Sequence, residues 1–267
     1  MGKLTSIEWC DHTFNIAWGC VKASPGCDNC YAEKLAHRYG YGWGDSAERR
    51  LFSDNYWNEP LRWNNAAIKS GIRQRVFCSS MTDVFLNDPI IDRQRERLWS
   101  VIEATPFLDW LILTKHPERF RAQLPQNFGA RFPTVWLMVS VENNDVKWRV
   151  RLLRETTASI RGLSVEPLLE NIGELEFAGI DWVIIGGESG PRSRPMDIAW
   201  AINVAERAAA AGAAIFVKQI GTVASKELGD GQHRHDPKGG DIRRWPESLR
   251  KRAFPVNSKL TNPIFPL

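Results

Sequence analysis

The stretch VWLMVSVENNDVKWRVRLLRETTASIRGLSVE, residues 135–166, decides the fold class of this chain. Two apolar runs, at 135–142 and 160–166, flank a segment at 145–155 that has the pattern of a helix. Both runs end in the same triplet, Ser-Val-Glu. A strand, a helix and a second strand in this order favour a parallel sheet covered by helices.

The same alternation of apolar runs and helical segments continues along the chain. Proline after Asp88 and after His116 marks two helix starts, because the first helical turn tolerates the missing N–H. The expected strands are 14–19, 76–80, 110–115, 135–142, 160–166, 182–187 and 214–219, and the expected helices are 89–104, 117–123, 145–155 and 198–211. Six or seven parallel strands predict an α/β fold, a partial or complete parallel (β/α) barrel.

Length and composition indicate one main folded unit. With 267 residues and 43% hydrophobic content the chain is long enough for one substantial core. We expect a barrel over residues 1–221 with an insertion at about 41–75, and a C-terminal extension, 222–267, that packs on it. No apolar run approaches the roughly 20 residues of a membrane span, and the start lacks the pattern of a signal peptide, so a cytoplasmic protein is expected. The formal charge of +4 permits a polyanionic partner without requiring one.

Polar residues follow the predicted strands at corresponding places. In a β/α barrel the carboxyl ends of the strands converge on one face, which makes these residues candidates to line a pocket. Each could instead cap a helix or fix a turn. Three glutamates on successive strand ends would repel one another unless cations or ligand groups answered them. The candidates are Ser79, Ser80, Asp83, Thr114, Lys115, Ser140, Glu142, Ser164, Glu166, Glu188, Ser189, Lys218 and Gln219.

Three of the five cysteines crowd into the loop after the first strand. Cys20, Cys27 and Cys30 form a C-x6-C-x2-C pattern, and a Pro-Gly turn between the first two can bring the thiolates together. Three thiolates are one short of a closed cluster or structural zinc site, so the pattern indicates a metal centre with an open position. A structural zinc with Cys10, His12 or His37 as fourth ligand is an alternative, as is a dithiol redox pair of Cys27 and Cys30.

The remaining metal-ligand residue types are less informative. Cys78 lies within an apolar run, which favours core packing, and the position of Cys10 decides nothing. His233 and His235 could ligate a second metal, although neighbouring glycines favour plain loop residues.

The chain resembles a phage- and prophage-associated family of radical-SAM-like proteins of unassigned function. The resemblance is carried by SIEWCDHTFNIAWGCVKASPGCDNCYAE, by SVEN and SVEP, and by WVIIGGESGPRSRPMD with IFVKQIG. It implies a 4Fe-4S cluster on Cys20, Cys27 and Cys30, S-adenosylmethionine as cofactor, and a radical-SAM-like partial barrel. It also implies a three-Cys-motif partner protein and an electron donor such as flavodoxin or ferredoxin.

Two departures from the general radical-SAM pattern affect the cofactor contacts. Six residues instead of three lie between the first two cysteines, and Gly186-Gly187-Glu188 follows the sixth strand instead of the second. Glu188 therefore does not inherit the usual contact to the methionine amine. Ser79, Ser80 and Asp83 are the candidates for the methionine end and Glu142 for the ribose, and Ser140, Glu166 and Glu188 complete the predicted cofactor pocket.

The resulting hypothesis is an enzyme that generates a 5'-deoxyadenosyl radical for nucleic-acid modification or repair. A protein or small-molecule substrate is an alternative, as is a non-catalytic zinc-bearing nucleic-acid-binding protein. Arginines near Trp245, together with Arg192 and Arg194, could grip phosphates, and the tryptophans of 41–75 could stack on bases. Packing of these aromatics on the barrel is the competing interpretation.

Overall fold

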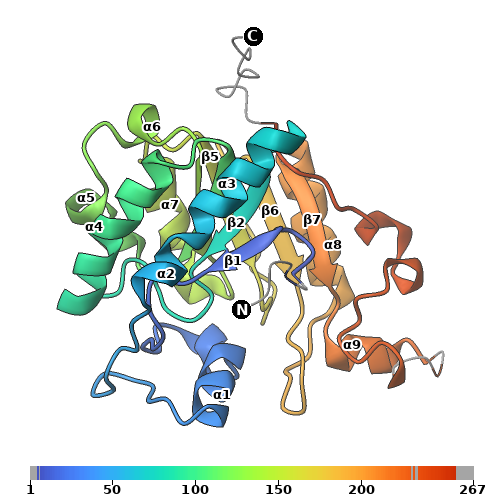
Figure 1. Cartoon of the computed structure of the whole chain (residues 1–267). Coiled ribbons are helices and arrows are strands. Elements are labelled where there is room, and N and C mark those ends of the chain that lie inside the picture. The colour runs from blue at the N-terminus through green and yellow to red at the C-terminus, as the bar shows by residue number, and fades with distance from the viewer. Residues whose placement is uncertain (1–4, 6, 230, 232–233, 257–267) are drawn as a thin grey trace.

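Seven parallel strands form a curled half-barrel in which the strands follow one another in chain order. The computed structural model describes residues 5, 7–229, 231 and 234–256. Figure 1 shows the strands side by side, with the loops that follow them, α1 and α9 at the lower side. The strands are β1 (His12–Phe14), β2 (Gln74–Cys78), β3 (Leu108–Thr114), β4 (Val135–Ser140), β5 (Ile160–Val165), β6 (Trp182–Gly186) and β7 (Ala214–Gln219). The predicted α/β half-barrel is thus confirmed.

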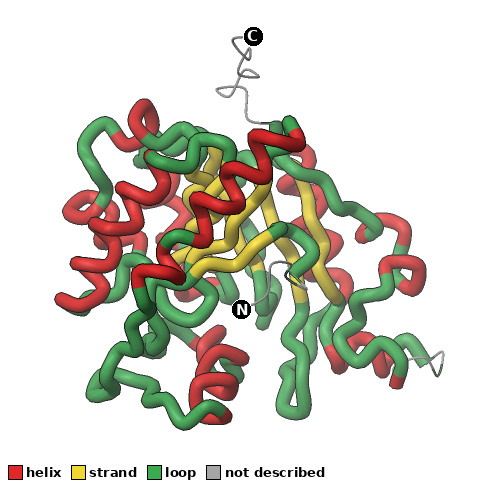
Figure 2. Tube along the Cα trace, viewed as in Figure 1, coloured by secondary structure: helices red, strands yellow, loops and turns green. Residues whose placement is uncertain are grey.

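Helices connect successive strands, except β5 and β6, which are joined by a loop, and they cover the outer side of the sheet (Figure 2). Asp88 caps the helix that follows β2 by accepting from the backbone N–H groups of Ile90 and Ile91, with Pro89 as its first residue. The α-helices are α1 (Tyr31–Arg38), α2 (Asp54–Trp57), α3 (Glu59–Ser70), α4 (Pro89–Glu103), α5 (Phe120–Gln123), α6 (Phe128–Arg131), α7 (Trp148–Arg154), α8 (Ile198–Ala210) and α9 (Thr222–Glu227). Short 3-10 turns are η1 (Pro25–Cys27), η2 (Pro117–Arg119), η3 (Asn144–Val146), η5 (Ile242–Arg244) and η6 (Glu247–Leu249).

The first strand departs most from its predicted bounds, while β2 and β3 each begin two residues earlier than predicted. A strand was expected at 14–19, but β1 spans His12–Phe14 and the chain leaves the sheet at Asn15. The Asn15 side chain accepts from the backbone N–H of Met81 at 2.7 Å, and the backbone N–H of Asn15 donates to the Tyr56 hydroxyl at 2.8 Å. These tertiary hydrogen bonds replace the sheet ladder, so the apolar run 16–19 continues as a buried loop.

Alternating side chains of the strands build two apolar cores, one on each side of the sheet. The outer core lies between the sheet and its helices and contains Val76, Trp110 and Leu137. The inner core lies inside the curl and contains Phe77, Leu111, Trp136, Met138, Trp182, Ile184 and Phe216. Toward the carboxyl ends of the strands the inward-facing residues become polar. Ser140 on β4 and Ser164 on β5 are register partners on this side.

Segments near the two ends of the described part of the chain close the inner side of the half-barrel. Trp9 packs edge-on against Phe77 and Trp182, with ring centroids 4.6 and 6.1 Å apart. From the other end, the backbone around Arg252 pairs antiparallel with β7 at Phe216. Phe254 then contacts Trp182, and the Trp182 indole donates to the carbonyl of Ala253 at 3.0 Å. The described part of the 222–267 segment therefore contacts the edge of the sheet.

The 41–75 segment contains the crossover helix α3, which lies between β1 and β2 in the chain. Trp57 and Trp63 are buried in the outer core, so they pack against the sheet. Among the described residues, none of the helices has the length and apolar character that crossing a bilayer requires.

Candidate functional site

The polar residues predicted at the strand ends lie together at the carboxyl edge of the half-barrel. Ser140 and Ser164 face the inner side in one row, and Glu142 and Glu166 follow two residues later on the same strands' ends. Because parallel strands have their carboxyl ends at one edge, the glutamates line the mouth of the curl.

Glu142 is fully buried and is surrounded by groups of this chain. It forms ion pairs with Lys115 and with Arg149, whose Nη1 is 3.0 Å from Oε2. The hydroxyl of Ser24 donates to Oε1 at 2.8 Å. Burial lowers the pKa of Lys115 to about 8, with Arg149 acting in the same direction. The carboxylate can remain charged in this buried position because two cations and a hydroxyl group bind to it.

The other two glutamates also have cationic partners from the chain. Glu166 pairs with Lys218, and both side chains remain partly exposed, at 17% and 24%. Glu188 pairs with Arg194, whose Nη2 lies 2.6 Å from Oε1. The repulsion expected among these carboxylates is thus offset by the protein itself, so their charges do not by themselves require a ligand.

The loop after β2 is fixed by its own hydrogen bonds. Asp83 accepts from the hydroxyl of Thr114 at 2.7 Å, from the backbone N–H of Lys115 at 2.8 Å and from that of Phe85 at 2.9 Å. Ser80 exchanges hydrogen bonds with the Asn15 side chain, and the Ser79 hydroxyl accepts from the backbone N–H of Ile16 at 3.4 Å. Ser79 and Ser80 join the β2 loop to the segment that leads to the cysteines, and Asp83 joins it to the end of β3.

The cysteine loop, residues 20–30, lies at the same edge and touches the buried glutamate. It includes the turn η1 and ends at Cys30, the N-cap residue of α1. A Cβ atom added at Gly26 would lie 2.4 Å from Oε1 of Glu142, so only glycine permits this approach. Together with the Ser24 hydrogen bond, this contact seats the loop on the end of β4.

The three thiols of this loop are near enough to influence one another electrostatically. Burial raises the pKa of Cys20 to about 12, and the proximity of Asp83, Cys27 and Cys30 also raises it. Burial likewise raises the pKa of Cys30, although hydrogen bonds with the backbone of Glu33 and Ala32 act against this. Metal binding must therefore displace the thiol protons, as ligation to a cationic centre does.

Within the described ranges, no three His, Cys, Asp or Glu side chains are grouped closely enough to hold a single metal ion as they stand. The four corners of an iron–sulfur cubane each carry their own ligand, so its sulfur ligands stand farther apart than those of one ion. Three thiols on one loop at the mouth of the half-barrel suit such a cluster in donor chemistry.

The other candidate ligands lie elsewhere. Cys10 belongs to the inner core and Cys78 to the outer core, and burial raises the pKa of each thiol to about 12. The His12 ring stacks on Trp63 and bonds to Gln74, and His37 is exposed on α1. His235 is exposed, and His233 lies outside the described residues.

Several residues that shape this site were not predicted as part of it. Ser24, Asn29 and Arg149 all contact the glutamates of the strand ends. The one sequence signal for them is the presence of a glutamate after three successive strands, because three neighbouring carboxylates require cations and hydrogen-bond donors from elsewhere in the chain. Their identity depends on contacts between segments more than a hundred residues apart in two of the three cases.

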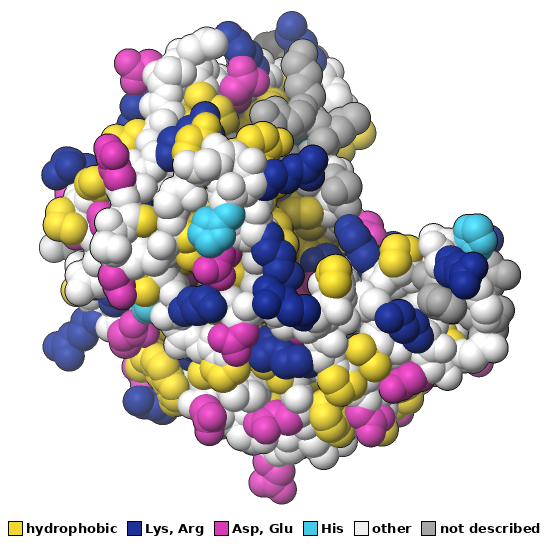
Figure 3. Space-filling view, turned by 90° about the horizontal axis from the view of Figure 1, so that it is seen from below, with side chains coloured by type: hydrophobic (Ala, Val, Ile, Leu, Met, Phe, Trp, Pro, Cys, Tyr) yellow, Lys and Arg dark blue, Asp and Glu magenta, His cyan; other side chains and the backbone are white. Residues whose placement is uncertain are grey.

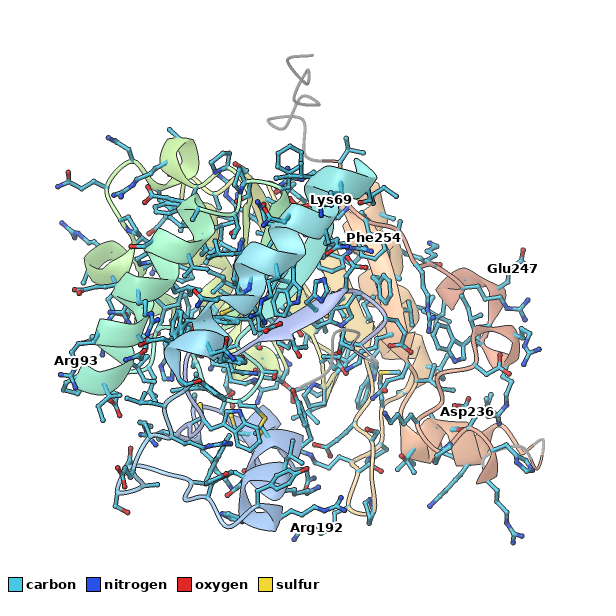
Figure 4. All side chains as sticks on the ribbon, viewed as in Figure 1. Lys69, Arg93, Arg192, Asp236, Glu247 and Phe254 are labelled. Carbon is cyan, nitrogen blue, oxygen red and sulfur yellow. The ribbon has the colours of Figure 1, made fainter. Side chains whose placement is uncertain are left out.

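The face that carries the cysteine loop is rich in basic side chains. Figure 3 shows Lys and Arg gathered in a band across this side, next to a hollowed area that contains hydrophobic side chains. Arg192 lies at the far end of the loop between β6 and α8, close to α1 (Figure 4). Trp245, in contrast, is 1% exposed and donates to the carbonyl of Gly239 at 3.0 Å, so it is packed within the protein.

The family described as "Protein of unknown function (DUF5131)" matches residues 4–252. No relative was found among curated proteins.

Among solved structures, the chain is similar to spore photoproduct lyase in three variant forms. One is 17% identical over 61% of this chain and 47% of the lyase, with a TM-score of 0.43. A second, with bound AdoMet and dinucleoside spore photoproduct, is 12% identical over 79% and 56%, with a TM-score of 0.46. The third, with the dinucleoside alone, is 13% identical over 63% and 54%, with a TM-score of 0.42. The chain thus spans about half the length of these lyase chains.

Proposed function

The chain belongs to this family of proteins of unknown function, and we propose that it is a radical S-adenosylmethionine enzyme that acts on nucleic acid. The observation that carries the proposal is the cysteine loop, which presents three thiols at the polar mouth of a parallel half-barrel. The resemblance in sequence and the donor chemistry of this loop support the same assignment.

In this proposal Cys20, Cys27 and Cys30 hold a 4Fe-4S cluster by three of its corners. The cluster would leave a site for S-adenosylmethionine, and together they would supply 5'-deoxyadenosyl-radical chemistry, the removal of a hydrogen atom from a substrate. A flavodoxin or ferredoxin would deliver the electron, and a three-Cys-motif protein would be the companion in a cytoplasmic setting.

The residues of the half-barrel would bind and orient the cofactor. Glu166 is the most exposed of the three glutamates and its partner Lys218 is also partly exposed, so this pair suits polar contacts to the ribose and amino acid parts of the cofactor. Asp83 and Glu142 already accept hydrogen bonds from several groups of the chain, so we assign them to holding the site in place. Ser79, Ser80 and Ser140 complete the surrounding polar wall. The apolar inner core below this layer keeps water out of the curl.

A nucleic-acid substrate is proposed from the basic band on the face around the mouth. Phosphates would contact exposed arginines such as Arg192, and affinity would then fall steeply with salt. A protein or small-molecule substrate that lacks a row of phosphates would show a much shallower dependence on salt.

The test is anaerobic reconstitution of the purified chain with iron and sulfide. We expect about four iron atoms per chain, loss of iron in Cys20→Ala, Cys27→Ala and Cys30→Ala, and retention in Cys78→Ala. Reduction in the presence of S-adenosylmethionine should release 5'-deoxyadenosine. A chain that takes up a lone zinc ion in place of iron, or that never cleaves the cofactor, would refute the proposal.

A further inference from the structure

The cysteine loop is gripped by the loop between β6 and α8, residues 187–197, which we call the clamp loop. Asn29 donates through Nδ2 to Oε2 of Glu188 and to the carbonyl of Arg192, both at 2.9 Å. Arg194 donates through Nη2 to the carbonyl of Pro25 at 3.0 Å, and its Nη1 lies 3.5 Å from Asp28. Two residues of the clamp loop and one backbone carbonyl therefore hold a segment some 160 positions earlier in the chain.

The grip depends on an ion pair that is itself tightly ordered. Glu188 accepts from the Nη2, Nε and backbone N–H of Arg194 at 2.6, 3.1 and 2.8 Å. Burial acts to raise the pKa of Glu188, but the hydrogen bonds from Arg194 and Asn29 outweigh it and lower the pKa, so the carboxylate stays ionised. With Nε and Nη2 held by one carboxylate, the guanidinium is oriented so that it also reaches Pro25.

The clamp loop is anchored on the rigid end of the sheet. The backbone N–H of Gly187 donates to the carbonyl of Gln219 at 3.0 Å, and the Gln219 amide donates back to the carbonyl of Gly187 at 2.9 Å. The carbonyl of Glu188 accepts from the backbone N–H of Thr222 at 3.0 Å. Glu188 and Arg194 thus connect the cysteine loop to the ends of β6 and β7.

The anchoring points alternate with the cysteines along the loop. Ser24, between Cys20 and Cys27, is bound to Glu142 at the end of β4. Asn29, between Cys27 and Cys30, is bound to Glu188 at the end of β6. The loop that follows β1 is therefore bound at the mouth of the half-barrel to the ends of both β4 and β6.

We infer that Glu188 and Arg194 are positioning residues that hold the cysteine loop in the shape required for cluster binding, and that Glu188 makes no contact with the cofactor. The inference rests on the proposed function for its connection to the cluster. It departs from the sequence-based expectation that placed Glu188 in the cofactor pocket. It also assigns a structural role to GGESGPRSRPMD, residues 186–197.

The first test uses the metal-free chain, so it does not depend on the proposed function. Hydrogen exchange of the backbone amides of residues 20–30 is compared between the parent, Glu188→Gln and Asn29→Ala. Loss of a hydrogen bond to a charged group should accelerate exchange in this loop roughly tenfold or more. Glu176→Gln is the matched control, because Glu176 is an exposed partner of Arg154 and its loss should leave the loop unchanged. Unchanged exchange in both Glu188→Gln and Asn29→Ala overturns the inference.

A double-mutant cycle shows whether the two residues act through one contact. If Asn29 and Glu188 act on the loop through each other, the double variant exchanges no faster than the faster single variant. Fully additive effects overturn the inference. The cycle also guards against misfolding, because Asn29 lies on a surface loop and its substitution leaves the clamp loop's ion pair with Arg194 in place.

The second test uses the reconstituted chain and measures the rate at which a chelator removes iron. Glu188→Gln should release iron about tenfold faster than the parent and the Glu176→Gln control, with the affinity for S-adenosylmethionine unchanged once the cluster is loaded. A normal rate of iron release combined with weakened cofactor binding would make Glu188 a cofactor contact, and the inference would fail. If the parent chain takes up no iron, the proposed function fails, and the exchange experiment still decides the role of the clamp loop.

Discussion

Replacing Gly26 by alanine should lift the cysteine loop from the end of β4. The added Cβ would lie 2.4 Å from Oε1 and 2.6 Å from Cγ of Glu142. Glu142 cannot retreat, because it is fully buried and is held by Lys115 and Arg149. The loop, which is less buried, must move instead.

The size of the effect follows from the contacts that this movement breaks. Lifting the loop breaks the hydrogen bond from Ser24 to the carboxylate, and hydrogen bonds to charged groups contribute about 1.5–3 kcal/mol. Overpacking by one methyl group in a tight site costs about 1–3 kcal/mol, but this describes the same displacement and is not added. A local cost of about 2 kcal/mol corresponds to roughly thirty-fold faster opening of the loop.

Hydrogen exchange of the amides of residues 24–30 measures this opening directly. Gly240→Ala is the matched control, because a Cβ there would meet its nearest atom, Oδ1 of Asp236, at an ordinary 3.7 Å. We expect roughly thirty-fold acceleration in Gly26→Ala and none in this loop for the control. Equal exchange in the two variants would show that the loop does not rest on Glu142 and would refute the reasoning.

Three further predictions follow from burial and charge. Burial raises the pKa of the Cys78 thiol to about 12, above the value of 9 in the unfolded chain. The contribution of the protonated thiol to the free energy of unfolding is therefore complete below pH 9 and is lost as the pH rises toward 12. Urea titrations should therefore show the deficit of Cys78→Ala against the parent narrowing by about 1 kcal/mol between pH 9 and pH 10, and a constant deficit would contradict this. Trp245→Ala should lower the free energy of unfolding by about 3–5 kcal/mol, because the indole is fully buried, and an unchanged urea midpoint would show that it is not a packing residue. Arg192→Ala should reduce the salt dependence of single-stranded DNA or RNA binding by about one phosphate contact, whereas Arg93→Ala, on helix α4 away from the mouth, should leave it unchanged (Figure 4); equal slopes for both variants would argue against contacts at Arg192.

The strands of the half-barrel could be predicted from sequence because each is a local apolar run with its own boundaries. β4 to β7 begin at the expected residues, and their register follows from the parallel order. The first strand was misplaced because the apolar run from Ile16 to Trp18 is buried by contacts with the β2 loop and not by strand pairing. Nothing local in the sequence distinguishes these two ways of burying apolar side chains.

The polar strand ends were predicted as positions, but their partners could not be. Periodicity places Glu142 and Glu188 at the carboxyl edge, whereas the choice of Ser24 and Asn29 as donors depends on where a long loop folds back. Such contacts join residues 118 and 159 positions apart, and a single sequence holds no record of them. Charge balance gave the one usable hint, since three buried or half-buried carboxylates require cations.

The repeated triplet that ends β4 and β5 now has two different structural tasks. At Ser140–Glu142 the carboxylate is buried and supports the cysteine loop, and at Ser164–Glu166 it stays partly exposed beside Lys218. The difference arises because Arg149, from the helix that follows β4, covers the first carboxylate, whereas among the described residues only Lys218 forms an ion pair with the second. An ion pair that remains open to solvent can exchange its partner for a ligand at low cost, whereas a buried one with three partners cannot. Substrate and cofactor contacts are therefore expected on the β5 and β7 side of the mouth, with the β4 side committed to holding the loop.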